Sequence, residues 1–120
     1  MPTLERVTEF ANRVLSNDHV RAIEDFYHDD ATMQENLNPP RGPRSALVEA
    51  EARMLAAHAG VVTKSNGPIF VSGDHSVVHW IFEFTRPNGS VMRIEELAYQ
   101  IWRGDRIAAE RFYYDPAQLK

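Results

Sequence analysis

Two long strand-like segments joined by a short turn constrain the fold of this chain more than any other feature of its sequence. Residues 75–86 read HSVVHWIFEFTR and residues 90–103 read SVMRIEELAYQIWR, with Pro87-Asn88-Gly89 between them. Both segments are rich in β-branched and aromatic residues, and Asn-Gly is a strong hairpin signal. We therefore predict that they pair as an antiparallel hairpin.

Further strand signals flank this hairpin. Residues 61–72 form one extended stretch that is interrupted at Asn66-Gly67-Pro68, and residues 106–114 follow a turn at Gly104-Asp105. Glycine, proline and asparagine mark such turns because of the backbone angles that they favour. The second half of the chain is thus predicted to be a four-stranded antiparallel meander.

The first half of the chain carries helical patterns. Thr3, Asp18 and Ser45 can each cap a helix whose apolar residues recur at helical spacing, and Gly60 is a good stop for the third. A short strand is predicted over residues 31–36, between the second and third helices. Helices segregated from an antiparallel sheet define an α+β domain.

The predicted architecture is a single domain over residues 1–120, a length that supports a real core. The sheet is expected to curve strongly, as a cone-like α+β barrel with the three helices packed in its concave side. Such a cone leaves a pocket at its open end.

The composition excludes several classes of function. The net charge is −4, whereas surfaces that bind nucleic acid or anionic membranes are usually basic. Cysteine is absent, which excludes disulfides and thiol catalysis. The N-terminus lacks the apolar core of a signal peptide, and no run approaches the roughly 18 apolar residues of a membrane span. The expectation is a cytoplasmic protein.

The five histidines do not predict a metal site, because no pair has the spacing of a helical ligand motif. His19, His28 and His58 are interpreted as helix-end or surface residues.

The hairpin turn allows the two sheet faces to be compared. If Asn88-Gly89 is a two-residue loop, Glu83 opposes Ile94, Ile81 opposes Glu96 and His79 opposes Ala98. Strand alternation then places these six residues on one face, and Trp80, Phe82 and Phe84 on the other. Periodicity alone favours the aromatic face under the helices. A second interpretation puts the aromatic face in a dimer interface and the mixed face inside the cone.

Three stretches of the chain resemble the nuclear-transport-factor-2-like superfamily, which includes ketosteroid isomerase, limonene-epoxide hydrolase, scytalone dehydratase and the SnoaL-like polyketide cyclases. They are AIEDFYHDDATMQEN, WIFEFTRPNGSVMRIEE and GDRIAAERFYYDPAQL. The resemblance covers almost the whole chain through the order and spacing of these stretches. Activity is determined by the residues of the site rather than by the fold, so the resemblance is specific for the fold and not for the activity.

In similar proteins the concave face holds the pocket and the convex face often pairs across a dimer. The resemblance therefore implies an interior face with His79, Ile81, Glu83, Ile94, Glu96 and Ala98, and a homodimer through Trp80, Phe82 and Phe84. A bulged turn at residues 103–106 would add Glu110, Phe112 and Tyr114 to the interior. A plain two-residue turn at Gly104-Asp105 would bring Arg111 and Tyr113 there instead, and both alternatives remain open.

The resemblance also implies a role for Glu35, since the aspartate base of ketosteroid isomerase falls on this residue. The isomerase's first-helix tyrosine falls near Ala11, and its acidic oxyanion donor falls on Ala98. The hydrolase's strand arginine and aspartate fall on His79 and Ile81. The sequence therefore departs from each known mechanism.

The expected function is cofactor-free proton transfer on a mostly apolar small molecule, giving isomerisation, cyclisation, dehydration or hydrolysis. Glu35 is predicted to be the base, with His79 and Glu96 as a helper acid or orienting pair. The residues expected to line the ligand site are Met33, Ile81, Glu83, Ile94, Ala98, Phe112 and Tyr114. The alternative is a non-catalytic module that binds a ligand or forms a dimeric interaction surface.

Overall fold

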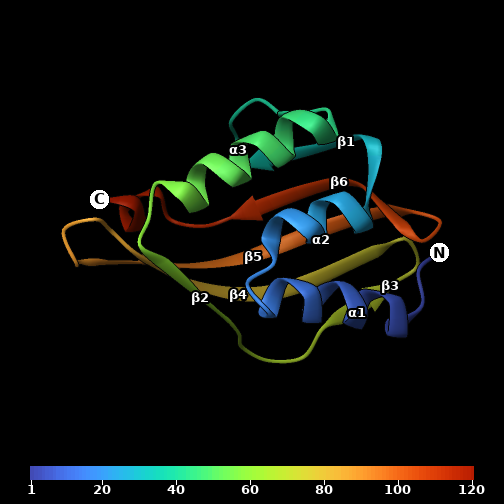
Figure 1. Ribbon diagram of the computed structural model, residues 1–120. Helices are drawn as coiled ribbons and strands as arrows, with labels where there is room; N and C mark the ends of the chain where they lie inside the picture. Colours follow the sequence, from blue (N-terminus) through green and yellow to red (C-terminus); the bar gives the residue numbers. More distant parts are fainter.

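The computed structural model describes residues 1–120 and confirms the predicted α+β class (Figure 1). Its helices are α1 (Leu4–Leu15), α2 (His19–Phe26) and α3 (Arg44–Ala56), followed near the C-terminus by a short 3-10 helix, η1 (Pro116–Leu119). Its strands are β1 (Tyr27–Glu35), β2 (Gly60–Ser65), β3 (Phe70–Ser72), β4 (His75–Thr85), β5 (Val91–Arg103) and β6 (Arg106–Tyr113).

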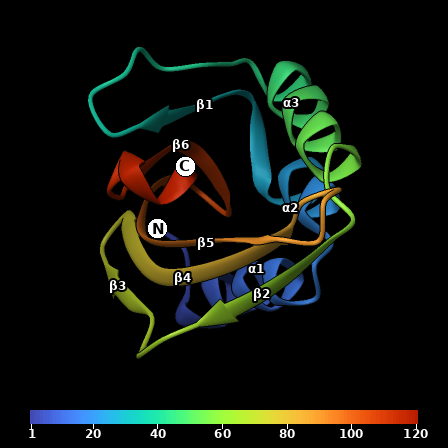
Figure 2. The same cartoon turned by 90° about the vertical axis from the view of Figure 1, so that its left-hand side faces the viewer.

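The six strands form one open, mostly antiparallel sheet in the order β1-β6-β5-β4-β2, with β3 also paired to β4. Only β1 runs parallel to its neighbour, β6. The three helices lie on the near side of the sheet in Figure 1, and the view turned by 90° shows the strands curving around them (Figure 2). The predicted meander and the break between β2 and β3 are confirmed. No helix is long and apolar enough to cross a membrane.

Helix α1 begins where the sequence predicts. The Thr3 side-chain oxygen accepts a hydrogen bond from the Arg6 backbone N–H at 3.0 Å, which satisfies a free donor of the first turn. The buried face of α1 carries Phe10, whose ring meets Trp102 of β5 edge-on at 6.0 Å between centroids. This contact ties the helical layer to the middle of the sheet.

The turn between β4 and β5 is one residue longer than predicted. Arg86 N–H donates to the Ser90 carbonyl at 2.8 Å across a three-residue loop, and Gly89 adopts a φ of 87°. A tight turn followed by a glycine in the left-handed region is a common three-residue hairpin. The predicted two-residue loop is therefore wrong.

The longer loop turns β4 over relative to β5, because a one-residue shift in register moves the side chains of one strand to the opposite face. Glu83 opposes Arg93, Ile81 opposes Glu95 and His79 opposes Leu97. These residues of β4 point away from the helices, so the interior face predicted for His79, Ile81 and Glu83 is wrong.

The aromatic side chains of β4 occupy the concave side instead, together with Ile94, Glu96 and Ala98 of β5. Trp80 and Phe84 are buried within the single chain, and Phe82 packs beside them. The periodicity-based alternative is thus correct, and a dimer interface built from these three aromatic residues is not.

The last hairpin combines the two predicted alternatives. Arg103 pairs with Arg106 across a plain two-residue turn, but a bulge at Ala108 follows between the pairs Trp102–Ile107 and Ile101–Ala109. The extra residue restores the alternation predicted for a bulged turn. Glu110 and Phe112 therefore face the concave side.

Strand β1 starts earlier than predicted and is held by the segment that follows it. Tyr27 already belongs to the strand, so His28-Asp29-Asp30 is not a helix end. Two hydrogen bonds of 2.9 and 2.7 Å join the backbones of Met33 and Arg41, which folds residues 36–43 back as a strap beside β1. The strap brings Arg41 close to the open end of the cone.

Gly42 of this strap provides a test of its packing. A Cβ at this position would lie 2.6 Å from the Ala31 carbonyl oxygen, a rigid backbone atom. We expect Gly42→Ala to destabilise the protein by about 1–3 kcal/mol, the usual cost of overpacking. Urea denaturation measures the change. Gly60→Ala is the matched control, because nothing lies within 4 Å of its added Cβ; equal stability losses in both variants would contradict the steric explanation.

Candidate functional site

A cavity of about 380 Å³ opens between the helices and the concave face of the sheet. Every helix and most strands contribute to its wall, which is mainly aromatic and aliphatic. Its apolar lining residues are Phe10, Val14, Ala22, Ile23, Tyr27, Met33, Ala50, Met54, Trp80, Phe82, Phe84, Ile94, Phe112, Tyr114 and Leu119. A concave, mostly apolar cavity with a few polar groups is the usual form of a small-molecule site.

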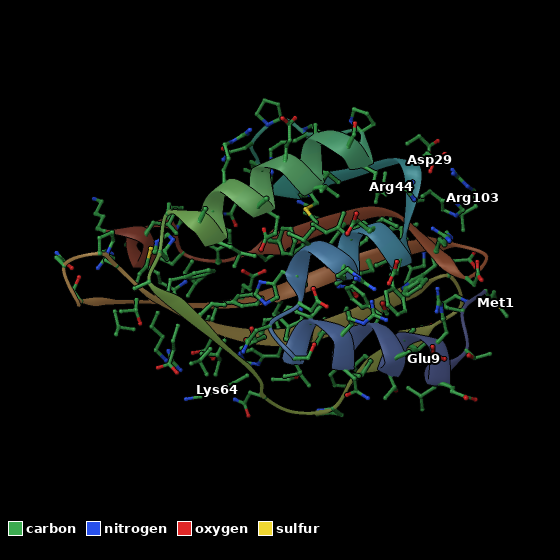
Figure 3. The ribbon with its side chains drawn as sticks, viewed as in Figure 1. Met1, Glu9, Asp29, Arg44, Lys64 and Arg103 are labelled. Atoms are coloured by element: carbon green, nitrogen blue, oxygen red, sulfur yellow. The ribbon has the colours of Figure 1, made fainter.

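Six polar residues interrupt this apolar wall: His19, Glu35, Arg41, Glu51, Glu96 and Glu110. Charged side chains elsewhere point away from the body of the molecule, as Figure 3 shows for Glu9, Lys64 and Arg103. Ionisable groups are rarely placed in apolar surroundings without a reason, so these six are the candidates for chemistry.

Glu35 lines the mouth of the cavity, where Arg41 holds it. The Arg41 Nη2 donates to both carboxylate oxygens, Oε1 at 2.8 Å and Oε2 at 2.9 Å, while its Nε reaches Oε2 at 3.2 Å. The Glu35 side chain remains 27 % exposed. The predicted position at the pocket is therefore found, but both oxygens already accept hydrogen bonds from a cation.

His19 and Glu51 form a second pair, deeper in the wall. The His19 Nδ1 lies 3.1 Å from Glu51 Oε1, and its Nε2 lies 2.8 Å from Thr63 Oγ1. His19 is the first residue of α2, as the helix-end interpretation predicts, but it is only 6 % exposed and is not a surface residue. The signal was present, since His19 lies on the stripe that also carries Ala22, Ile23 and Phe26.

Glu96 is buried in the wall of the cavity without a partner. It is 8 % exposed, and its Oε2 has no hydrogen bond. Burial, together with the nearby carboxyls of Glu110, Glu35 and Glu51, raises the pKa of Glu96 to about 8. Its predicted partner, His79, lies on the outer face and binds Glu95 instead, with Nε2 and Oε2 2.7 Å apart.

Glu110 is buried more deeply and is fully hydrogen-bonded. It is 3 % exposed; Tyr27 O–H donates to its Oε1, and Gln100 Nε2 donates to its Oε2 at 2.7 Å. Burial raises the pKa of Glu110 to about 7, while these two hydrogen bonds oppose the rise. The sequence pattern assigns no chemistry to Glu110, because its inward position depends on the bulge in β6.

Four of the seven other predicted ligand-site residues line the cavity, and three do not. Met33, Ile94, Phe112 and Tyr114 line the cavity as expected. Ala98 is fully buried in the core and is not part of the wall. Ile81 and Glu83 lie on the outer face, where Glu83 Oε1 is 2.8 Å from Lys64 Nζ.

Comparison with known families identifies the fold of this chain. Residues 7–110 match the family described as the SnoaL-like domain. A search of curated proteins found no match.

Solved structures agree with this family match. A candidate SnoaL-like polyketide cyclase from Mesorhizobium loti is 23 % identical, with 95 % of this chain and 100 % of that chain covered and a TM-score of 0.79. A ketosteroid isomerase-like protein from Catenulispora acidiphila, solved with trimethylamine, is 18 % identical over 97 % of this chain and 89 % of that one, with a TM-score of 0.78. TerC, co-crystallised with polyporic acid, is 15 % identical over 99 % and 95 %, with a TM-score of 0.80.

The buried carboxyl of Glu96 predicts how stability depends on pH. The unfolded chain releases this proton near the ordinary value of 4.5, whereas the folded chain keeps it up to about pH 8. Stability should therefore fall as pH rises between these values. Glu96→Gln removes that cost, and we expect it to stabilise the protein by about 2–4 kcal/mol at pH 9 and little at pH 4.

Urea denaturation of both proteins from pH 4 to pH 9 measures this difference. Glu83→Gln is the control, because Lys64 lowers the pKa of Glu83, so this carboxyl causes no loss of stability as pH rises. A Glu96→Gln variant that loses stability with pH as steeply as the parent protein between pH 5 and pH 8 would show that Glu96 is not buried as described.

Proposed function

The chain belongs to the SnoaL-like family, and on that premise we propose that it is a cofactor-free enzyme that transfers protons on a neutral, mostly apolar small molecule. The observation that carries this proposal is a pair of buried carboxyls, Glu96 and Glu110, in a cavity whose Arg41 and His19 are each already bound to another glutamate. Two acids whose surroundings set different pKa values are a recognised basis for an acid and a base in one site.

Glu96 is assigned as the acid. With a pKa of about 8 it carries its proton at neutral pH, and its Oε2 has no partner within the protein. It can therefore donate a hydrogen bond, and then a proton, to an acceptor such as a carbonyl oxygen of the ligand. The surrounding apolar wall strengthens this interaction because it excludes water.

Glu110 is assigned as the base. With its pKa raised to about 7 it titrates near neutral pH, which suits a group that must both take and return a proton. Removal of a proton next to the carbonyl by Glu110, with donation to the oxygen by Glu96, gives an enol. If the substrate carries a double bond conjugated with this enol, Glu110 returns its proton to the far carbon while Glu96 takes back the enol O–H proton, which isomerises the substrate. Alternatively, the enol carbon attacks a second carbonyl, whose oxygen takes the proton from Glu110 while Glu96 takes back the enol O–H proton, and this closes a ring.

Glu35, predicted from the resemblance as the base, is assigned instead to the mouth of the cavity. Its carboxylate is ion-paired with the Arg41 guanidinium and partly exposed, whereas Glu110 is buried and meets only neutral donors. Glu35 and Arg41 together form a polar rim around an apolar interior. His79 has no direct role in this proposal, since it lies on the outer face.

The wall also limits the class of ligand. Arg41 and His19 are each bound to a glutamate, so an anionic ligand would meet carboxyl groups without a free cation. A volume of about 380 Å³ lies near the lower end of ordinary ligand sites. A small neutral ketone or related aromatic compound fits these conditions, and the complex of TerC with polyporic acid supports a small-molecule ligand in this fold.

The second candidate function is a non-catalytic ligand-binding module. The separation of His79 from Glu96 favours it, because the predicted catalytic set is incomplete. The cavity itself suits either function, and the buried carboxyls of Glu96 and Glu110 on its wall favour the enzyme.

Hydrogen exchange on carbon tests the enzymatic proposal with any ligand that carries a hydrogen next to a carbonyl group. A thermal-shift screen first selects binders among apolar ketones and polyketide-like aromatics. NMR in D₂O then follows deuterium entry next to the carbonyl of each binder. We expect Glu110→Gln to slow this exchange at least about 100-fold, because a positioned general base contributes about 10²–10⁴-fold.

The control for this experiment is His79→Ala, which changes an outer residue and should leave the exchange rate unchanged. Ligands that bind without any catalysed exchange would favour the non-catalytic module. Undiminished exchange in Glu110→Gln would remove Glu110 from the role of base.

We also propose that two copies of the chain pair through the outer face of the sheet. Leu97, Ile101 and Tyr113 are exposed there, on neighbouring strands β5 and β6. Neighbouring charges such as Arg93 and Glu95 are paired, so the face carries little net charge. Apolar residues grouped on one face favour association.

Light scattering at micromolar concentration tests this pairing. We expect a dimer for the parent protein and a monomer for Leu97→Glu, which places a charge in the interface. Leu37→Glu, at an exposed position in the strap, should stay dimeric. A monomeric parent protein would contradict the proposal.

A further inference from the structure

A chain of buried hydrogen bonds runs behind the wall of the cavity and ends on Glu110. Trp102 Nε1 donates to Ser76 Oγ at 2.8 Å, Ser76 Oγ donates to Gln100 Oε1 at 2.6 Å, and Gln100 Nε2 donates to Glu110 Oε2 at 2.7 Å. Trp102, Ser76 and Gln100 are all buried, with at most 2 % of any of them exposed. We call these three residues the relay.

The direction of the relay follows from the chemistry of its first member. An indole N–H can donate but never accept, so Ser76 must accept from Trp102. The hydroxyl hydrogen of Ser76 is then free to point at Gln100, whose Oε1 is an acceptor. The amide of Gln100 consequently presents its N–H to Glu110.

The reverse arrangement leaves a buried donor without a partner. If Glu110 donated a proton toward Gln100, the amide would turn its Oε1 to Glu110 and its Nε2 to Ser76. Ser76 would then accept from two donors, and its own hydroxyl hydrogen would have no acceptor among the side chains of the relay. Because an unmet buried donor is costly, the relay favours Glu110 as an acceptor.

We propose that Trp102, Ser76 and Gln100 are positioning residues, which hold the carboxylate of Glu110 in its ionised form and at a fixed orientation toward the cavity. The inference rests on the proposed function, in which Glu110 is the base. It assigns a task to three residues that touch neither the cavity nor its ligand.

Gln100, at the end of the relay, lowers the pKa of Glu110, whereas burial and the nearby carboxyl groups raise it. The titratable and charged groups that face the same cavity are His19 of α2, Tyr27 and Glu35 of β1, Arg41 of the strap, Glu51 of α3, Glu96 of β5 and Tyr114 after β6. Glu35 and Glu51 raise the pKa of Glu110 along with burial, whereas Gln100 and Tyr27 lower it. Tyr27 supplies the second donor from outside the relay.

Carbon-13 NMR of the glutamate side-chain carboxyls tests this inference directly. The resonance of Glu110 is identified by its loss in Glu110→Gln, and its position is followed from pH 4 to pH 9. We expect Ser76→Ala to raise the pKa of Glu110 by about one pH unit, since the hydrogen bond of Gln100 to a charged partner loses its fixed direction. Trp102→Phe should shift it in the same direction.

Ser76→Thr is the matched control, because threonine keeps the hydroxyl group and should leave the pKa near that of the parent protein. Circular dichroism checks the fold, and Trp102→Phe carries the test if Ser76→Ala does not fold. An unchanged pKa in a folded Ser76→Ala or Trp102→Phe variant would overturn the inference.

The same measurement separates this inference from the proposed function. A raised pKa in Ser76→Ala with no loss of hydrogen exchange in Glu110→Gln would support the relay but remove Glu110 as the base. A rate lost in Glu110→Gln without any change of pKa in the relay variants would support the base and overturn the relay. When both hold, the pH at which exchange reaches half its maximum should move upward in Ser76→Ala.

Discussion

The pairing of β4 with β5 is the interaction on which the rest of the structure depends. These strands lie at the centre of the sheet, and their register determines which side chains meet the helices. Because the turn has three residues and ends at Gly89, the side chains of Trp80, Phe84 and Glu96 all lie on the concave side of the sheet, in the wall of the cavity. The core, the cavity and its charged groups all follow from that one turn, because a strand has only two faces.

The cavity places stability and chemistry in opposition. Apolar walls stabilise the fold through burial, yet they also remove water from Glu96 and Glu110 and so penalise their ionised forms. A surface glutamate such as Glu83, beside Lys64, experiences the opposite effect. Neither Glu96 nor Glu110 forms a salt bridge that would offset this cost, and the raised pKa values that result are the basis of the proposed acid and base roles.

Most of the fold could be predicted from sequence, because hydrophobic periodicity and turn residues are local signals. The helices, the strands, the break before β3 and the aromatic face of β4 all follow from them. The site was harder to predict, since it depends on single-residue choices that the pattern leaves open. The length of the turn between β4 and β5, two or three residues, determines whether His79 or Trp80 faces the interior. The bulge in β6 determines whether Glu110 or Arg111 does so. Gln100 gave no signal at all, because a buried amide in a strand has meaning only through its partners.

The bulge at Ala108 gives β6 an unusual sensitivity to insertion. Glu110 and Arg111 are neighbours of opposite charge, and only the phase of the strand determines which of them enters the cavity. One residue inserted after Ala109 would carry Glu110 to the outer face and bring Arg111 inward, opposite Ala98. The same scaffold would then offer a buried guanidinium, which favours anions. In evolutionary terms, a single inserted codon would convert the proposed proton-transfer pocket into one suited to carboxylate ligands, with the rest of the fold unchanged.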